Sequence, residues 1–240
     1  MCKLYLSLHP EFYNLNLMKK LFFSFIFASV LVGHLFATEN KSTDLGAEID
    51  IYAEYSPIKQ VTISLGEEIA LANFLLPENG VFDGCKTVFT TSYTPHPNIA
   101  LEVAYEFLYS DSEVMEHNAQ LSVTPQVELG DFALSLQETA QMSYATIDES
   151  YKWQLISKLE LAYAIPNVPL STYVYVEMKN PLECKVAEPV EAQSWYDEFC
   201  YRAGLNWSVD EINKLGIYYE FAHTIDSYKH LIGIGYTIGF

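Results

Sequence analysis

The residues that could do chemistry are mainly carboxylates, joined by a few basic side chains with the same spacing. The set is Glu102, Glu106, Glu128, Lys158, Glu160, Glu177, Glu198, Arg202, Lys214 and Glu220. Most of them recur at even intervals within short segments, and residues two apart share one face of a β-strand. This face is predicted to line a lumen. It would either attract cations and handle protons, or form an ion-pair network that fills and orders the interior.

Histidines are the side chains that could serve as catalytic bases. His223 and His230 flank one connection that also carries Asp226 and Ser227, while His96 and His117 lie elsewhere. A hydrolase would need a nucleophile, a base and an orienting group within hydrogen-bond reach, and the spacing does not show this. The chain also has no glycine-rich phosphate loop. The sequence therefore predicts no catalytic residue and no cofactor, with an outer-rim hydrolase kept as an alternative.

The cysteines predict no metal site. Cys85, Cys184 and Cys200 follow the N-terminal segment in a pattern without CxxC or Cys/His ligand spacing. Their odd number gives no disulfide framework, and a single bridge between two of them is left open.

Composition excludes one class of partner. The chain of 240 residues has a formal net charge of −18, and Arg202 is its one arginine. Nucleic acid is therefore not expected as a partner, because binding it needs basic patches. Charged residues are 18% of the chain while hydrophobic residues are 50%, a low charged fraction for a soluble domain.

The N-terminal segment has the pattern of a secretory signal. Met18-Lys19-Lys20 precedes an apolar run over 21–36, and Ala37 offers a small residue before a polar stretch. We predict that residues 1–37 are an upstream extension plus signal peptide, with the real start at Met18, and that 38–240 form one domain. A membrane-anchor helix is the alternative, although the run is shorter than the ~20 residues that such a helix needs.

Alternating apolar and polar residues dominate the rest of the chain. They predict strands at 45–55, 60–71, 85–94, 99–109, 117–128, 131–142, 151–164, 170–180, 197–208, 212–222 and 228–239. Segments of about ten residues, aromatic at both ends of the apolar face and joined by alternately short and long connections, are typical of outer-membrane barrels. The expected fold is all-β: a closed antiparallel transmembrane β-barrel of 10–12 strands with a small polar lumen.

Two details do not fit this pattern. The strand list has eleven members, whereas bacterial barrels have even numbers. Either 45–55 lies outside the wall, which gives ten strands, or a further strand in 38–46 gives twelve. Glu138 interrupts an apolar series, which predicts that it lies near the rim or that a bulge resets the alternation.

The chain ends on an apolar face formed by Ile232, Ile234, Tyr236, Ile238 and Phe240. Tyr236, Ile238 and Phe240 have the spacing of the signal read by the barrel assembly machinery. That machinery is thus expected as a partner during biogenesis, and outer-membrane lipid afterwards. The protein is expected to be a monomer in the bacterial outer membrane.

From Leu101 to Phe240 the chain resembles a family of outer-membrane barrels described as domain of unknown function 2490. The resemblance is carried by the segments 169–177, 201–205, 216–220 and 230–240. Members usually carry several lumenal arginines facing glutamates, and here Arg202 remains, with Lys158 and Lys214 as substitutes. The resemblance implies the barrel architecture and no activity.

The functional expectation is a passive role, as a structural barrel or a narrow channel for cations or small solutes. The alternation of apolar and polar residues does not show which face of the strands points into the barrel. A soluble periplasmic barrel that binds lipid between inward-facing apolar side chains is therefore a further alternative.

Overall fold

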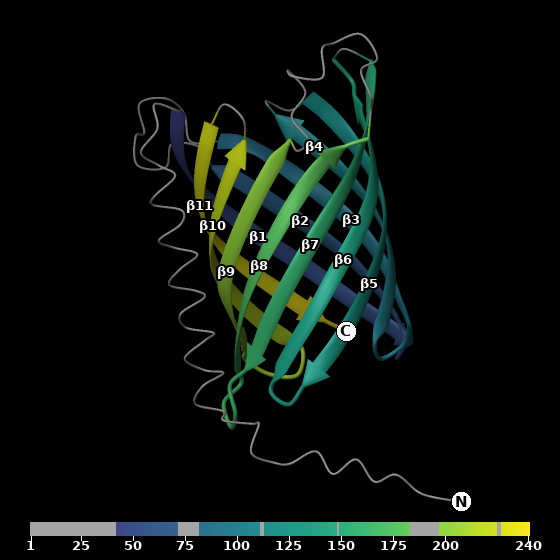
Figure 1. Ribbon diagram of the computed structural model, residues 1–240, viewed down its shortest axis with the longest axis vertical. Coiled ribbons are helices and arrows are strands. Elements are labelled where there is room, and N and C mark those ends of the chain that lie inside the picture. The colour runs from purple at the N-terminus through teal and green to yellow at the C-terminus, as the bar shows by residue number, and fades with distance from the viewer. Residues whose placement is uncertain (1–41, 72–81, 111–112, 148, 183–196, 225–226) are drawn as a thin grey trace, which may run out of the picture. The chain divides into compact units, whose positions relative to one another are not determined.

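The computed structural model describes residues 42–71, 82–110, 113–147, 149–182, 197–224 and 227–240, and these form eleven strands (Figure 1). They are β1 (Ser42–Ile58), β2 (Val61–Leu71), β3 (Phe82–His96), β4 (Ile99–Ser110), β5 (Glu113–Leu129), β6 (Phe132–Ala145), β7 (Ser150–Ala164), β8 (Leu170–Pro181), β9 (Glu198–Ser208), β10 (Asn213–Thr224) and β11 (Ser227–Gly239). Every strand predicted from alternation is present. Among the described residues, no helix is long and apolar enough to cross a membrane.

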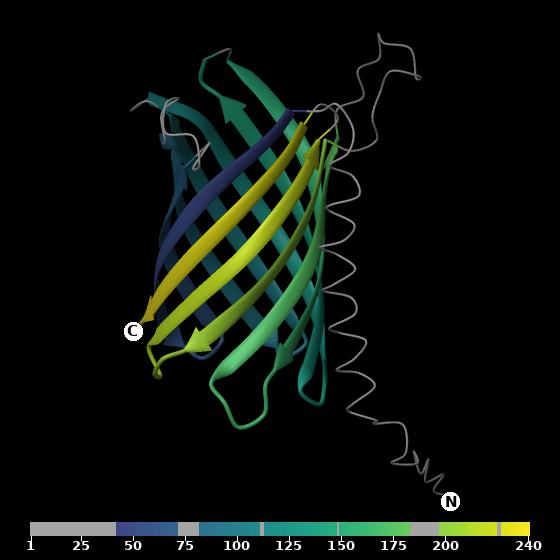
Figure 2. The ribbon, with the colours of Figure 1, turned by 90° about the vertical axis from the view of Figure 1, so that its left-hand side faces the viewer.

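The strands close into one barrel in which each is paired with its neighbour in sequence, and β1 is paired with β11. Figure 2 shows these first and last strands side by side. The expectation of an even number was wrong. β1 belongs to the wall and no additional strand is found in the described residues, so the barrel has eleven strands.

An odd number makes the first and last strands run in the same direction, so the seam is parallel. The register runs from Ser42 opposite Ser227 to Glu54 opposite Gly239 without a shift. All other neighbouring pairs are antiparallel. The antiparallel barrel that was expected is therefore closed by one parallel pair.

The outer face of the wall is apolar. Side chains that alternate toward it include Ile51, Val103 and Ile217, which are 49%, 58% and 58% exposed. Others on this face are Ile49, Leu65, Phe89, Leu101, Leu121, Leu134, Leu136, Leu159, Ile232 and Ile234. Continuous exposed apolar surface of this kind belongs in hydrocarbon rather than water. The fold is therefore that of a transmembrane β-barrel.

Aromatic side chains gather toward both ends of this apolar band. Toward one rim, Phe107, His117, Tyr144 and Tyr151 follow one another across four strands, with ring centroids 5.4, 6.2 and 4.7 Å apart. Toward the other rim lie Tyr55, Tyr93, Trp207 and Tyr236. Such girdles mark the two membrane interfaces of transmembrane barrels.

The connections depart from the strict alternation of short and long. One rim has the short turns 59–60, 97–98, 130–131, 165–169 and 209–212, as expected. At the other rim only 72–81 and 182–197 are long, because the strands on either side of 111–112 and 225–226 extend further than predicted. Gly130, in the turn 130–131, has φ +66°, a left-handed conformation that glycine adopts without strain.

The barrel forms one unit, Asn40–Phe240. The proposed signal peptide and the start at Met18 lie outside the described residues. Cys85 and Cys200 are free thiols, and Cys184 also lies outside the described residues.

Candidate functional site

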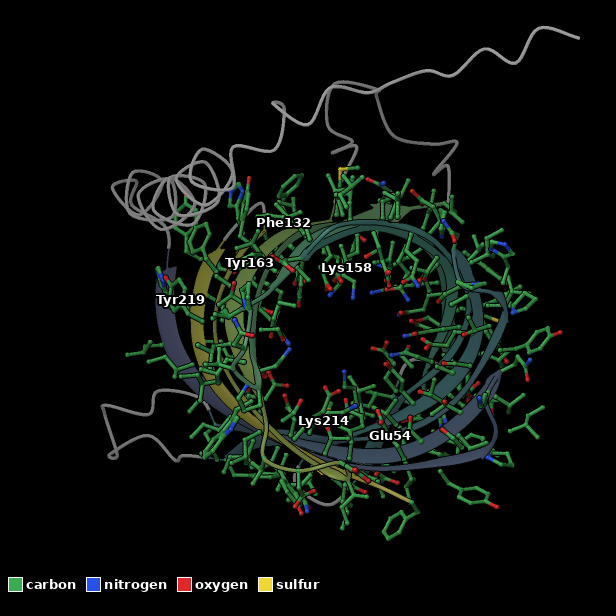
Figure 3. The ribbon with its side chains drawn as sticks, turned by 90° about the horizontal axis from the view of Figure 1, so that it is seen from below. Glu54, Phe132, Lys158, Tyr163, Lys214 and Tyr219 are labelled. Carbon is green, nitrogen blue, oxygen red and sulfur yellow. The ribbon has the colours of Figure 1, made fainter. Side chains whose placement is uncertain are left out.

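The polar residues predicted for the lumen lie on the inner face of the wall, as judged from the alternation of exposed outer residues and from the cavities they line. Figure 3 shows the ring with Lys158 and Lys214 pointing inward and Tyr219 pointing outward. Some residues of the predicted set contact one another, and others lie apart.

One group surrounds Arg202 on β9. Its guanidinium lies 2.6 Å from Glu220 on β10, and it also donates from Nε to the same carboxylate at 2.7 Å. The guanidinium carbon lies 3.9 Å from the centroid of the Tyr218 ring and 5.5 Å from that of Tyr175. Glu48 on β1 is 4.0 Å away. Stacking on aromatic faces and a bound carboxylate together hold the guanidinium in one position.

Tyr218 carries this group across the parallel seam. Its hydroxyl on β10 lies 2.9 Å from Glu48 Oε2 and 2.8 Å from Asp50 Oδ2, both on β1. To reach them the ring passes over β11 at Gly233, which is directly opposite Tyr218 in the register. A Cβ at Gly233 would overlap that ring. The glycine therefore makes room for a contact that joins β10 to β1.

Two further tyrosines lie on glycines in the same way. Tyr173 on β8 covers Gly204 on β9, where a Cβ would meet the ring at 2.5 Å, and Tyr52 on β1 covers Gly66 on β2. Tyr52 donates to Glu68. Each pair places a large lumenal ring against a neighbouring strand without a side chain, which packs the wall without filling the whole interior.

A second charged group continues from the seam onto β2, β3 and β4. Lys86 lies 2.5 Å from Glu68 and 3.8 Å from Glu106. Glu48, Asp50 and Glu68 have oxygen atoms within 4.8 Å of one another, close enough to hold a metal ion. Lys86, Arg202 and the two tyrosine hydroxyls already contact these carboxylates, so the cluster is explained as part of the ion-pair network.

The remaining predicted residues are dispersed. Lys214 lies 3.7 Å from Glu54, and Glu198 lies 2.6 Å from Lys179, which is also 4.0 Å from Glu177. Lys158 lies over the Tyr175 ring at 5.1 Å. Ser92 donates to Glu102. For Glu128 and Glu160 the described residues show no ion pair.

Three cavities of 540, 450 and 470 Å³ occupy the lumen among the described residues, and Lys86 lines all of them. Ten carboxylates and six basic groups line the three together, which leaves an excess of four carboxylates. The interior is thus polar and acidic. A soluble barrel with inward apolar faces does not fit this structure, because the apolar faces point outward.

Sequence reasoning missed the residues that join the two charged groups. Lys86, Glu48, Asp50 and Glu68 all have the required alternation, but they were not included in the set. Tyr218 was also absent from the predicted set. Its position between Gly216 and Glu220, on the polar face of an alternating segment, was the available signal.

Both explanations predicted for Glu138, a position near the rim or a bulge, were wrong. Glu138 lies at the middle of β6, and the pairing of β6 with β5 and β7 contains no register shift, so neither a rim position nor a bulge explains it. The carboxylate faces outward between Leu136 and Ala140 and accepts a hydrogen bond of 2.7 Å from Ser157. Glu67 on β2 is its counterpart, with Thr87 and Cys85 as donors at 2.8 and 3.1 Å.

Each of the four histidines considered for catalysis makes a different contact. His117 and His230 face outward and are bonded to Tyr105 and Tyr219. The ring of His223 stacks on Tyr228, and the Ser227 hydroxyl is bonded to Thr224. His96 accepts a hydrogen bond from the Asn98 amide, and Asp226 lies outside the described residues.

No protein-family model matches the sequence, so the resemblance stated above stays a prediction, and no curated protein matches it either. Among solved structures, OccK11 (OpdR) of Pseudomonas aeruginosa is similar at 11% identity with a TM-score of 0.35. The match covers 70% of this chain and 52% of that one, so the chain spans about half the length of OccK11. Values this low do not establish a shared function.

Proposed function

We propose that this chain is a bacterial outer-membrane β-barrel whose lumen forms a narrow passage that prefers cations. The observation that supports the proposal is the excess of carboxylates around the lumenal cavities. Acidic walls of low dielectric concentrate counter-ions and repel anions. Lys86 and Arg202 compensate part of this charge and hold the acidic side chains in place, which keeps the passage narrow.

Outer-membrane placement is part of the proposal. It is supported by the apolar outer band and the two aromatic girdles. Carbonate extraction of membranes tests it. The protein should stay with the membrane fraction and need detergent to remain soluble, and release in carbonate would contradict the proposal.

Planar-bilayer recording of the purified protein in a KCl gradient tests the passage. The reversal potential should have the sign of a cation-selective pore. Glu68→Gln, which removes a lumenal charge beside Lys86, should reduce the selectivity, whereas Glu211→Gln in the exposed turn 209–212 should not. A closed barrel without conductance would favour a structural role, and anion preference would refute the proposal.

A further inference from the structure

One part of the lumen wall carries no charge. The lumenal residues of β5 between 118 and 124, and those of β6 between 135 and 143, are all amides or hydroxyls. Six of them line the largest of the three cavities, which has a volume of 540 Å³. We name these six residues the amide wall: Asn118, Gln120, Gln137, Thr139, Gln141 and Ser143. Five carboxylates and four lysines line the rest of this cavity, so the amide wall is an uncharged surface inside a charged cavity.

The amide wall is ordered by its own hydrogen bonds. Gln120 donates to Gln141 at 3.0 Å, and Gln141 donates to Ser143 at 2.9 Å. These bonds fix the orientation of the carboxamides. Each carboxamide has two donor hydrogens and two acceptor lone pairs, so one or two bonds leave much of its capacity free for a ligand.

Asn118 is a second, independent feature of the amide wall. The residue is 4% exposed and lines the cavity, and its Nδ2 donates to Glu106 at 3.0 Å. Its Oδ1 has no hydrogen-bond partner in the described part of the chain. Buried polar atoms are normally paired, so this oxygen is an open acceptor in the amide wall.

We propose that the amide wall binds a neutral mono- or disaccharide. Sugar hydroxyls both donate and accept, which matches a surface of amides and hydroxyls and requires no charge. Leu108 and Ile156 are the apolar lining residues, so the cavity does not suit an apolar ligand. Its volume lies within the range of about 300–1,000 Å³ for small-molecule sites. This proposal rests on the proposed function, because it names the class of solute that the passage would take.

Isothermal titration calorimetry on the full-length protein in detergent tests the site without requiring conductance. Sucrose, trehalose and maltose serve as neutral probes, and at least one should bind saturably. Gln120→Leu keeps a similar volume but removes the carboxamide, and should weaken that binding about tenfold, the worth of one or two hydrogen bonds. Thr124→Val is the matched control because it changes the same face of β5 outside the cavity.

Gln120→Glu provides a second variant of nearly unchanged shape, and heat-modifiable migration shows that each variant is folded. Its carboxylate accepts hydrogen bonds but cannot donate one to Gln141, so the order of the wall is lost and binding should weaken, as with Gln120→Leu. Saturable binding by a protein that does not conduct would retain the sugar site and refute the passage. Conductance without any sugar binding, or equal weakening by Thr124→Val, would overturn the sugar site.

Discussion

Gly233→Ala should weaken the barrel strongly through its effect on Tyr218. The added Cβ would overlap the tyrosine ring, so the ring must leave its position over β11. Its hydroxyl would then lose the carboxylates of Glu48 and Asp50, and its face would lose the Arg202 guanidinium. A hydrogen bond to a charged group contributes about 1.5–3 kcal/mol and a cation–π contact about 0.5–2 kcal/mol. The free energy of unfolding should therefore fall by roughly 2–5 kcal/mol.

Urea unfolding in lipid vesicles measures this loss. Gly235→Ala is the matched control, because it lies on the same face of β11 and its Cβ would find its nearest neighbour, Asp50, at an ordinary 3.9 Å. Tyr218→Ala should relieve the overlap, so adding Gly233→Ala to that variant should cost little. A double-mutant cycle isolates the coupling between the two positions.

Two results would contradict this role of Tyr218. Equal losses from Gly233→Ala and Gly235→Ala would show that the overlap is unimportant. Additive effects in the cycle would show that the ring and the glycine act independently. Either result would refute the assignment of Tyr218 as the contact that joins the two sides of the seam.

Three further predictions concern other parts of the barrel. Glu138→Gln removes a carboxylate from the outer apolar face, so stability in vesicles should rise by about 1 kcal/mol; a loss would mean that the bond from Ser157 outweighs the cost in lipid. The pKa of Asp210 is lowered by hydrogen bonds from Asn213 and Ile212, so its stabilising contribution is present at neutral pH and disappears as pH falls through that lowered value. Asp210→Ala should thus destabilise at pH 7 but not in strong acid, and an equal effect at both pH values would contradict this. Deletion of Phe240 should impair assembly in cells, and unchanged heat-modifiable migration would show that Phe240 is not needed as an assembly signal.

The eleven strands could be predicted because the pattern that specifies each strand lies in residues that are close together in the sequence. An apolar side chain at every second position, with turn residues between segments, is visible in the order of the residues themselves. The same alternation placed Arg202 and Glu220 on one face, and cross-strand pairing then brought them to 2.6 Å. Segment ends were less predictable, since strands near 111–112 and 225–226 extend beyond the expected turns.

A closed barrel was expected, but the strand pair that closes it could not be predicted in this way. The alternation exposed eleven strands, but the even-number rule argued against them, and nothing local states that β1 pairs with β11. That pairing joins residues such as Ser42 and Ser227, which are neighbours in the wall but far apart in the sequence. Its benefit is that no strand edge is left unpaired in lipid, a gain that exists only once the whole wall is assembled.

The sequence by itself determined the strands, their two faces and the acidic character of the polar one, because a period of two is a property of neighbouring residues. The tertiary structure decided which polar residues meet. Tyr218 reaches Glu48 and Asp50 only because the wall closes in parallel and Gly233 leaves space above β11. Contacts across the seam depend on strands far apart in the chain, and only the folded barrel brings those strands together.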